Sequence, residues 1–238
     1  DAAAAAEAPA SGAGAADEPV APPAPSMGVQ TLACADAVPD PQADNFLKDT
    51  PAFKRDMPGV SMATIRRCLE EEPFIMQKCF ELDIKAYDIK PSKWQRSAHS
   101  PGTLIRCMKF KMPLPDDVPG AAKSMITLPD FCTCQSLCRL RVAASELDLT
   151  YQTIVDGMPF ADYFRLQVTD SFTPFGDAPD GGITFRRWVV IVWVKELPWM
   201  MRPARSFVAS KTMAGAADAA KILVDLFTEE GAKAESAG

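Results

Sequence analysis

The stretch from Gly182 to Lys195 is the feature that most limits how this chain can fold. It is the longest β-branched and aromatic run in the sequence, and such residues suit a pleated, half-buried surface, so a strand is predicted. From Trp188 onward the run is apolar on both faces, so other parts of the chain or a partner must cover each side. Alternation defines the two faces: Ile183, Phe185, Val189, Ile191 and Trp193 on one, and Thr184, Arg186, Trp188, Val190, Val192 and Val194 on the other.

Both ends of the chain differ in composition from its middle. Residues 1–44 are rich in Ala and Pro, with no periodicity over the first 26, and we expect a disordered tail. We place the ordered domain at residues 45–228 and a second flexible tail at 229–238. Without Glu7, Asp17, Glu18 and the charged residues of 229–238, the formal charge of −6 falls to −1. A near-neutral domain has no basic footprint for nucleic acid, and no apolar run reaches the roughly 20 residues that span a bilayer.

The middle of the chain changes from a helical to a strand period. We predict a first strand within residues 45–54, a helix capped by Ser61 with Val60 and Ile65 as a hydrophobic staple, and a second helix after Pro73. Turn-rich separators then divide a series of strands whose connections are mostly too short for crossover helices, which favours an antiparallel meander. These strands are expected at residues 84–94, 103–112, 124–142, 146–155, 163–173 and 183–195.

Pro203 opens the last element, a helix expected to end near Phe227. Its narrow apolar stripe is spaced four and three residues apart, as one helix face requires: Ala209, Met213, Ala216, Ala220, Leu223 and Phe227. We therefore predict the α+β class, with a curved antiparallel sheet wrapped around this long C-terminal helix, which is the helix-grip plan.

Three cysteines occur close together within one predicted strand. The spacing Cys-x-Cys-x-x-x-Cys at Cys132, Cys134 and Cys138 differs from the paired Cys-x-x-Cys of most zinc sites. Small buried hydrophobic side chains are the favoured interpretation, and zinc or redox chemistry is the alternative. With seven cysteines and no disulfide spacing, we expect a reducing, cytosolic environment.

The side chains on the strand face that carries these cysteines are too small to fill a core by themselves. Either large residues opposite fill the gap, or the gap is an apolar cavity of the kind that binds small molecules. On the cavity interpretation, the lining comes from three strands and the last helix: Cys132, Cys134, Ser136, Cys138, Leu140, Phe164, Leu166, Val168, Trp188, Val190, Val192, Met213, Ala216 and Ala220.

An apolar segment precedes the last helix. Trp199, Met200 and Met201 stand beside Arg202, and such a group suits contact with a membrane surface. The alternative is that these residues seat the helix on the sheet.

Several short motifs resemble the VASt domain, a StART-like module of sterol transporters of the Aster and Lam type. The segment Asp156–Phe164 resembles that family's Asp-Val-Pro-Tyr-Gly-Asp-x-Phe signature, and residues 192–195 resemble its Val-x-Trp-x-Lys strand end. Pro91 to Trp94 is similar to its Pro-Trp step, and Arg106 to Phe110 to its Arg-x-x-x-Tyr strand. The match extends from about Pro58 to Phe227.

The resemblance implies a lipid carrier that performs no covalent chemistry and needs no cofactor or metal. A sterol or another lipid would occupy a cavity between sheet and helix and pass between membranes. The site of action would be the cytoplasmic face of intracellular membranes, at endoplasmic reticulum contact sites. Two other hypotheses remain: an interaction module on the same fold with a filled cavity, and a helix-grip enzyme. The enzyme needs an acid/base set, against which the single histidine, His99, argues.

Overall fold

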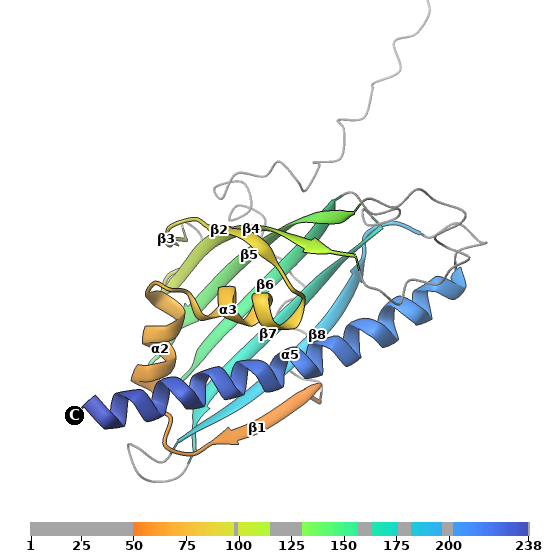
Figure 1. Ribbon diagram of the computed structural model, residues 1–238. Coiled ribbons are helices and arrows are strands. Elements are labelled where there is room, and N and C mark those ends of the chain that lie inside the picture. The colour runs from red at the N-terminus through yellow and green to blue at the C-terminus, as the bar shows by residue number, and fades with distance from the viewer. Residues whose placement is uncertain are drawn as a thin grey trace, which may run out of the picture.

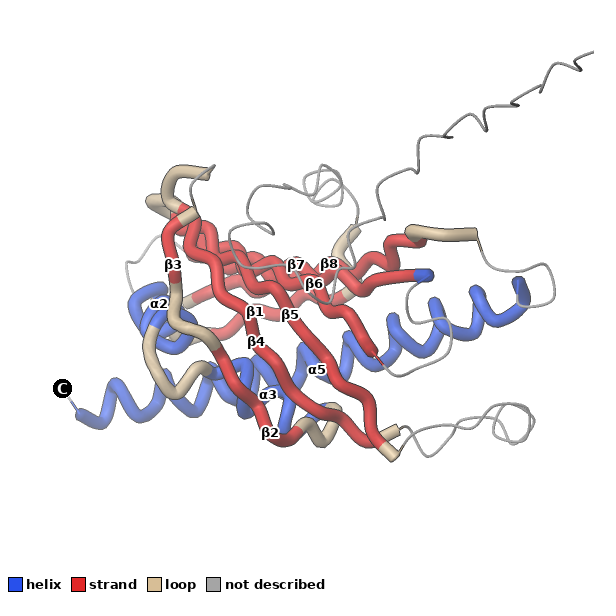
Figure 2. Tube along the Cα trace, turned by 90° about the horizontal axis from the view of Figure 1, so that it is seen from above, coloured by secondary structure: helices blue, strands red, loops and turns tan. Residues whose placement is uncertain are grey.

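The computed structural model describes residues 50–97, 100–114, 130–156, 163–175, 182–196 and 202–237. These residues form two layers: an antiparallel sheet of eight strands and, on one of its faces, three helices (Figure 1). The view from above shows that β2, β4 and β5 curve toward the helix layer (Figure 2). The prediction of an α+β fold, in which a curved antiparallel sheet packs on a long C-terminal helix, is confirmed.

The strands follow one another across the sheet much as they do along the chain. Their order is β1-β8-β7-β6-β5-β4-β2, with β3 paired to β4, so β4 to β8 form the predicted meander. The strands are β1 (Phe53–Met57), β2 (Tyr87–Pro91), β3 (Gln95–Arg96), β4 (Thr103–Pro113), β5 (Phe131–Val142), β6 (Leu147–Asp156), β7 (Phe164–Pro174) and β8 (Ile183–Trp193). The helices are α2 (Met62–Glu70), α3 (Ile75–Asp83) and α5 (Arg202–Ala237).

The first strand lies later in the chain than predicted. It covers Phe53–Met57 and pairs with β8, where Met57 lies opposite Ile183. The expected strand included Pro51, which has no N–H to donate to a ladder, and the pairing begins only after it. The expected positions 45–49, like the predicted tail 1–44, lie outside the described residues.

The start of α2 agrees with the sequence. The hydroxyl of Ser61 accepts a hydrogen bond from the Thr64 backbone N–H at 3.1 Å, which satisfies one of the free donors of the first turn. Val60 and Ile65, the predicted staple, both lie buried in the core. The second predicted helix is α3, which begins two residues after Pro73.

The last helix is longer than predicted, and the expectation of a flexible tail at residues 229–238 is wrong. Helix α5 continues to Ala237. Its final turns are held from the side: Glu230 pairs with Arg67 of α2, and Glu229 pairs with Lys78 of α3. Gly231 is buried, because α5 passes close to the loop before α2. A Cβ added at Gly231 would lie 3.2 Å from Val60 of that loop.

The two halves of α5 are packed differently. The predicted stripe is correct in the second half, where Ala220, Leu223 and Phe227 are fully buried and Phe227 meets Phe172 edge-on at 5.3 Å. In the first half Met213 is 42 % exposed and nothing lies within 4 Å of a Cβ added at Gly215. The helix is therefore anchored in the core only from about Ala216 onward.

Candidate functional site

The strand register decides which side chains face the helix layer. We call that side the inner face: Phe172 on it contacts Phe227 of α5, and Phe110 and Tyr151 contact Phe80 of α3. Residues opposite one another in an antiparallel pair point to the same side of the sheet. Through the register these contacts place eight of the predicted lining residues together on the inner face, as expected: Cys132, Cys134, Ser136, Cys138, Leu140, Phe164, Leu166 and Val168.

Three other predicted lining residues lie on the opposite side of the sheet. Trp188, Val190 and Val192 pair with Thr169, Gln167 and Arg165, whose side chains point away from the helices. The assignment of the two faces of the strand was therefore inverted. Val189, Ile191 and Trp193 face inward, because they pair with Val168, Leu166 and Phe164.

The cysteine side of the inner face is filled. Cys134 lies opposite Phe110 on β4, and Cys138 lies opposite Tyr151 on β6. Helix α3 places Phe80 on both aromatic rings, with centroid distances of 5.1 Å to Phe110 and 5.9 Å to Tyr151. Large residues therefore occupy the space that the small cysteines leave, which is the first of the two alternatives considered from the sequence.

The cysteines also lack the features of a reactive or metal-binding site. Burial raises the pKa of Cys79, Cys134 and Cys138 to about 12, so these thiols are protonated at neutral pH. Among the described residues, no three His, Cys, Asp or Glu side chains are arranged to hold a metal ion. The one histidine, His99, lies outside the described residues.

The inner face of β6, β7 and β8 is less enclosed. Toward the end of β8 it carries six apolar side chains that are only half-buried, which we call the half-buried patch: Val155, Phe164, Leu166, Val189, Ile191 and Trp193. The first half of α5 lies along this patch, since Arg205 contacts the Trp193 ring at 4.9 Å and Ala216 is hydrogen-bonded to Arg187. Of the predicted helix residues, Ala216 is half-buried, Met213 is exposed and Ala220 is buried in the anchored half.

A hydroxyl pair borders the half-buried patch. Ser136 and Thr153 lie opposite one another on β5 and β6, and their hydroxyl oxygens are 2.6 Å apart. Ser136 is fully buried and Thr153 is half-buried. The pair brings two hydroxyl groups, which can donate and accept hydrogen bonds, to the edge of an apolar surface.

An ion pair closes the other end of the patch. Arg187 and Asp170 are opposite each other on β8 and β7, and neither side chain is exposed. Arg187 donates two hydrogen bonds to the Asp170 carboxylate and a third, at 3.1 Å, to the backbone carbonyl of Ala216. Burial opposes the charge of Arg187, but the attraction of Asp170, its hydrogen bonds and the nearby Tyr151 together outweigh burial and raise the pKa of the guanidinium. The pair thus holds α5 to the sheet at the point where the helix becomes anchored.

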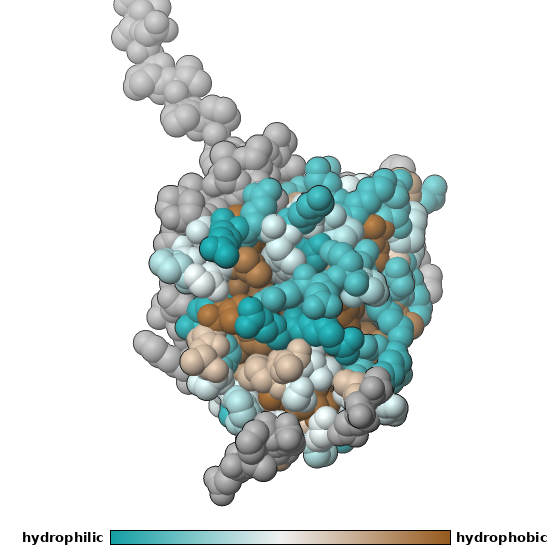
Figure 3. Space-filling model, turned by 90° about the vertical axis from the view of Figure 1, so that its left-hand side faces the viewer, coloured by the Kyte–Doolittle hydropathy of each residue, from teal (hydrophilic) through white to brown (hydrophobic). Residues whose placement is uncertain are grey.

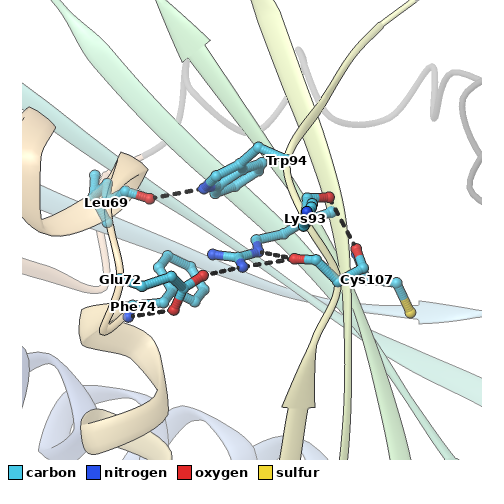
Figure 4. A network of polar contacts seen from close by, with 8 residues as sticks. Leu69, Glu72, Phe74, Lys93, Trp94 and Cys107 are labelled. Atoms are coloured by element: carbon cyan, nitrogen blue, oxygen red, sulfur yellow. Dashed lines mark hydrogen bonds and ion pairs between the residues drawn. The ribbon is translucent and has the colours of Figure 1, made fainter.

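A second buried arginine fixes α2 and α3 to the sheet. The guanidinium of Arg106 lies between the rings of Phe74 and Trp94, 4.5 Å and 4.8 Å from their centroids. It donates hydrogen bonds to the Ser92 carbonyl and to Glu72, which in turn accepts one from the Phe74 N–H. Figure 4 shows Trp94 reaching across to Leu69, whose carbonyl accepts a hydrogen bond from the indole N–H at 3.2 Å. These contacts tie the junction of the two helices to β4.

Sequence reasoning missed both buried arginines as structural elements. Arg187 was assigned to neither face of its strand, although its position in the alternation is that of Phe185 and Val189. The predicted membrane-contact residues Trp199, Met200 and Met201 lie outside the described residues, as do residues 157–162 of the signature segment.

The chain matches no protein-family model and no curated protein. Within the described helices, no segment combines the length and the apolar character needed to cross a membrane.

Proposed function

We propose that this protein binds a lipid of the sterol class between the sheet and the first half of α5, and transfers it between membranes without chemical change. The proposal takes the two-layer architecture to be a StART-like helix-grip fold of the VASt type. It rests on one observation above all: the half-buried patch consists of neighbouring apolar side chains along α5 that remain partly exposed.

The composition of this region suits a lipid. An apolar wall with a few polar groups at its edge is the usual form of a small-molecule site, and here the polar group is the half-buried Thr153 hydroxyl, which is hydrogen-bonded to the buried Ser136. Removing the patch and a sterol from water would stabilise the complex by roughly 25 cal/mol for each Å² of apolar surface buried. Arg187 takes no part, because each of its three guanidinium nitrogens already donates to Asp170 or Ala216.

The place of action follows from the same proposal. A lipid carrier works where its cargo is, so we propose that the domain acts at the cytoplasmic face of intracellular membranes, at contacts of the endoplasmic reticulum. Its partners are the lipid and the membrane surfaces that donate and receive it.

The test uses two neighbouring residues of β8. Val189→Trp adds bulk to the half-buried patch, whereas Val190→Trp adds the same bulk on the opposite face of the sheet, and both valines are half-buried. We expect a fluorescent sterol to bind the wild type and Val190→Trp with one-to-one stoichiometry and Val189→Trp at least about tenfold more weakly. The proposal fails if folded wild-type protein binds neither a sterol nor a phospholipid, or if both variants bind equally.

A second candidate function is favoured by the filled cysteine side. Phe80, Phe110 and Tyr151 leave that part of the inner face closed, as expected of an interaction module that has kept the fold without the cavity. On this hypothesis the half-buried patch receives a protein segment instead of a lipid. Native mass spectrometry of the purified protein distinguishes the two hypotheses. Co-purified lipid supports the carrier, whereas a lipid-free mass in a protein that binds no added sterol supports the interaction module.

A further inference from the structure

The charges of α5 are distributed unevenly along its length. Residues 202–217 contain three basic residues and no acidic one, whereas residues 218–237 contain five acidic residues and two basic ones. Helix stability favours the reverse, because the N-terminus of a helix dipole is positive and the C-terminus negative. The distribution therefore does not serve the helix, and it makes the first half of α5 its basic half.

Aromatic and apolar side chains gather at the same end. Arg205 of α5 lies over the Trp193 ring, and Trp193 in turn contacts Phe164 at 5.3 Å. Next to them Val194 is 48 % exposed, and Lys195 lies 5.6 Å from the centre of the Tyr163 ring. We call Trp193, Val194, Lys195 and Arg205 the basic tip. Rings that stand between cations and apolar groups are typical of side chains at a membrane–water interface.

We propose that the basic tip docks on an anionic lipid bilayer, with Lys195 and Arg205 at the headgroups and Val194 and Trp193 inserted among them. Charge complementarity selects this partner: the exposed Glu196 offsets the neighbouring Lys195, but the first half of α5 carries basic residues and no acidic one. Each basic side chain near an anionic leaflet adds to the attraction. An exposed valine beside aromatic rings adds the apolar contact that interfacial binding also needs.

The distribution of charge also sets the orientation. An anionic bilayer attracts the basic first half of α5 and repels its second half, in which acidic residues predominate. Figure 3 views the molecule from the opposite end, where α2 and the last turns of α5 lie and hydrophilic residues predominate. Docking by the tip therefore holds α5 pointing away from the bilayer and brings Phe164 and Trp193, which belong to the half-buried patch, next to the lipid.

That docking serves lipid uptake rests on the proposed function. Docking itself is measured with protein to which no sterol has been added. The full chain is sedimented with vesicles of phosphatidylcholine alone and with vesicles that also contain about 30 % phosphatidylserine. The second composition imitates an anionic leaflet. We expect binding only to the anionic vesicles, and we expect it to weaken as salt is raised, because salt screens charges at the surface.

Two matched double variants locate the site. Lys195→Glu with Arg205→Glu reverses two charges at the basic tip, and Lys221→Glu with Lys233→Glu reverses two exposed charges in the second half of α5. We expect the first pair to weaken vesicle binding by about tenfold or more and the second pair to have little effect. A third variant, Val194→Ser, tests the apolar contact and should weaken binding while leaving its salt dependence unchanged.

The possible results are distinct. Equal losses in the two double variants would show that only net charge matters and would overturn the proposal, as would absence of binding to anionic vesicles. Full binding by Val194→Ser would overturn the inserted part. Sterol binding by wild-type protein that fails to dock would refute the docking alone, and docking by protein that binds no lipid would refute the carrier function alone.

Discussion

Arg187 and Asp170 face each other across β8 and β7 and form two parallel hydrogen bonds, Nε to Oδ1 at 2.6 Å and Nη2 to Oδ2 at 2.7 Å. Both side chains are excluded from water, and the same guanidinium binds the backbone of α5 at Ala216. The attachment of the long helix to the sheet therefore depends on a charge pair in an otherwise largely apolar layer.

Removal of one partner of this pair should be costly. Asp170→Ala leaves Arg187 charged and buried, and we expect the free energy of unfolding to fall by about 3–5 kcal/mol in a urea titration. The double variant Asp170→Leu with Arg187→Met removes both charges and should recover most of that loss. A loss below about 1 kcal/mol in the single variant would mean that water reaches the site.

The buried thiols should make the protein sensitive to alkali. The pKa of Cys79 is 9.0 ordinarily and about 12 in the fold, so its contribution to stability is complete below pH 9 and is lost as the pH rises toward 12. In that window the unfolded chain releases a proton that the folded chain keeps, and each such thiol lowers stability by about 1.4 kcal/mol per pH unit. Cys79→Ala should reduce the slope by about that amount between about pH 10 and 11.

The control for this slope is a core residue on the same helix that does not titrate. Met76→Ala should lower the free energy of unfolding by a similar amount at every pH. Identical slopes in the wild type and Cys79→Ala would contradict the buried, protonated thiol.

Replacement of Arg106, which lies between two aromatic rings, should destabilise the fold even when the charge is kept. Arg106→Lys keeps the charge but loses the planar group that lies between Phe74 and Trp94 and the paired hydrogen bonds to Ser92. We expect a loss of about 2–4 kcal/mol in thermal or urea unfolding. Arg66→Lys, at an exposed pair with Glu70, should stay within about 0.5 kcal/mol of wild type.

Two glycines of α5 should respond differently to alanine. A Cβ at Gly215 meets nothing within 4 Å, so Gly215→Ala should raise the free energy of unfolding by up to about 1 kcal/mol through helix propensity alone. At Gly231 the added Cβ lies 3.2 Å from Val60 and 3.4 Å from the Gly59 carbonyl oxygen, and this crowding should offset the gain. Equal stabilisation by both substitutions would show that the last turns of α5 are not held against the loop.

The sequence by itself determined the elements and their order. Alternation in the strands, the hydroxyl of Ser61 and the stripe that ends at Phe227 are local signals, since each depends on residues within a few positions of one another. The prediction of a meander followed from turn lengths, which also are local. The exceptions are the bounds of β1 and the end of α5, whose last turns contact Val60, Arg67 and Lys78, residues that are distant in the sequence.

Only the tertiary structure decided which face of β8 looks inward. Alternation separates Val189 from Val190 but is symmetric with respect to the two sides of a sheet, and both sides of this strand are apolar. The side is chosen by contacts that no local pattern contains: Asp170 accepts from Arg187, and Arg187 reaches Ala216 on a helix 29 residues later in the chain. A buried charge must have its partner on the same face, and that requirement, met only when the strands and α5 come together, fixed the inner face and the half-buried patch upon it.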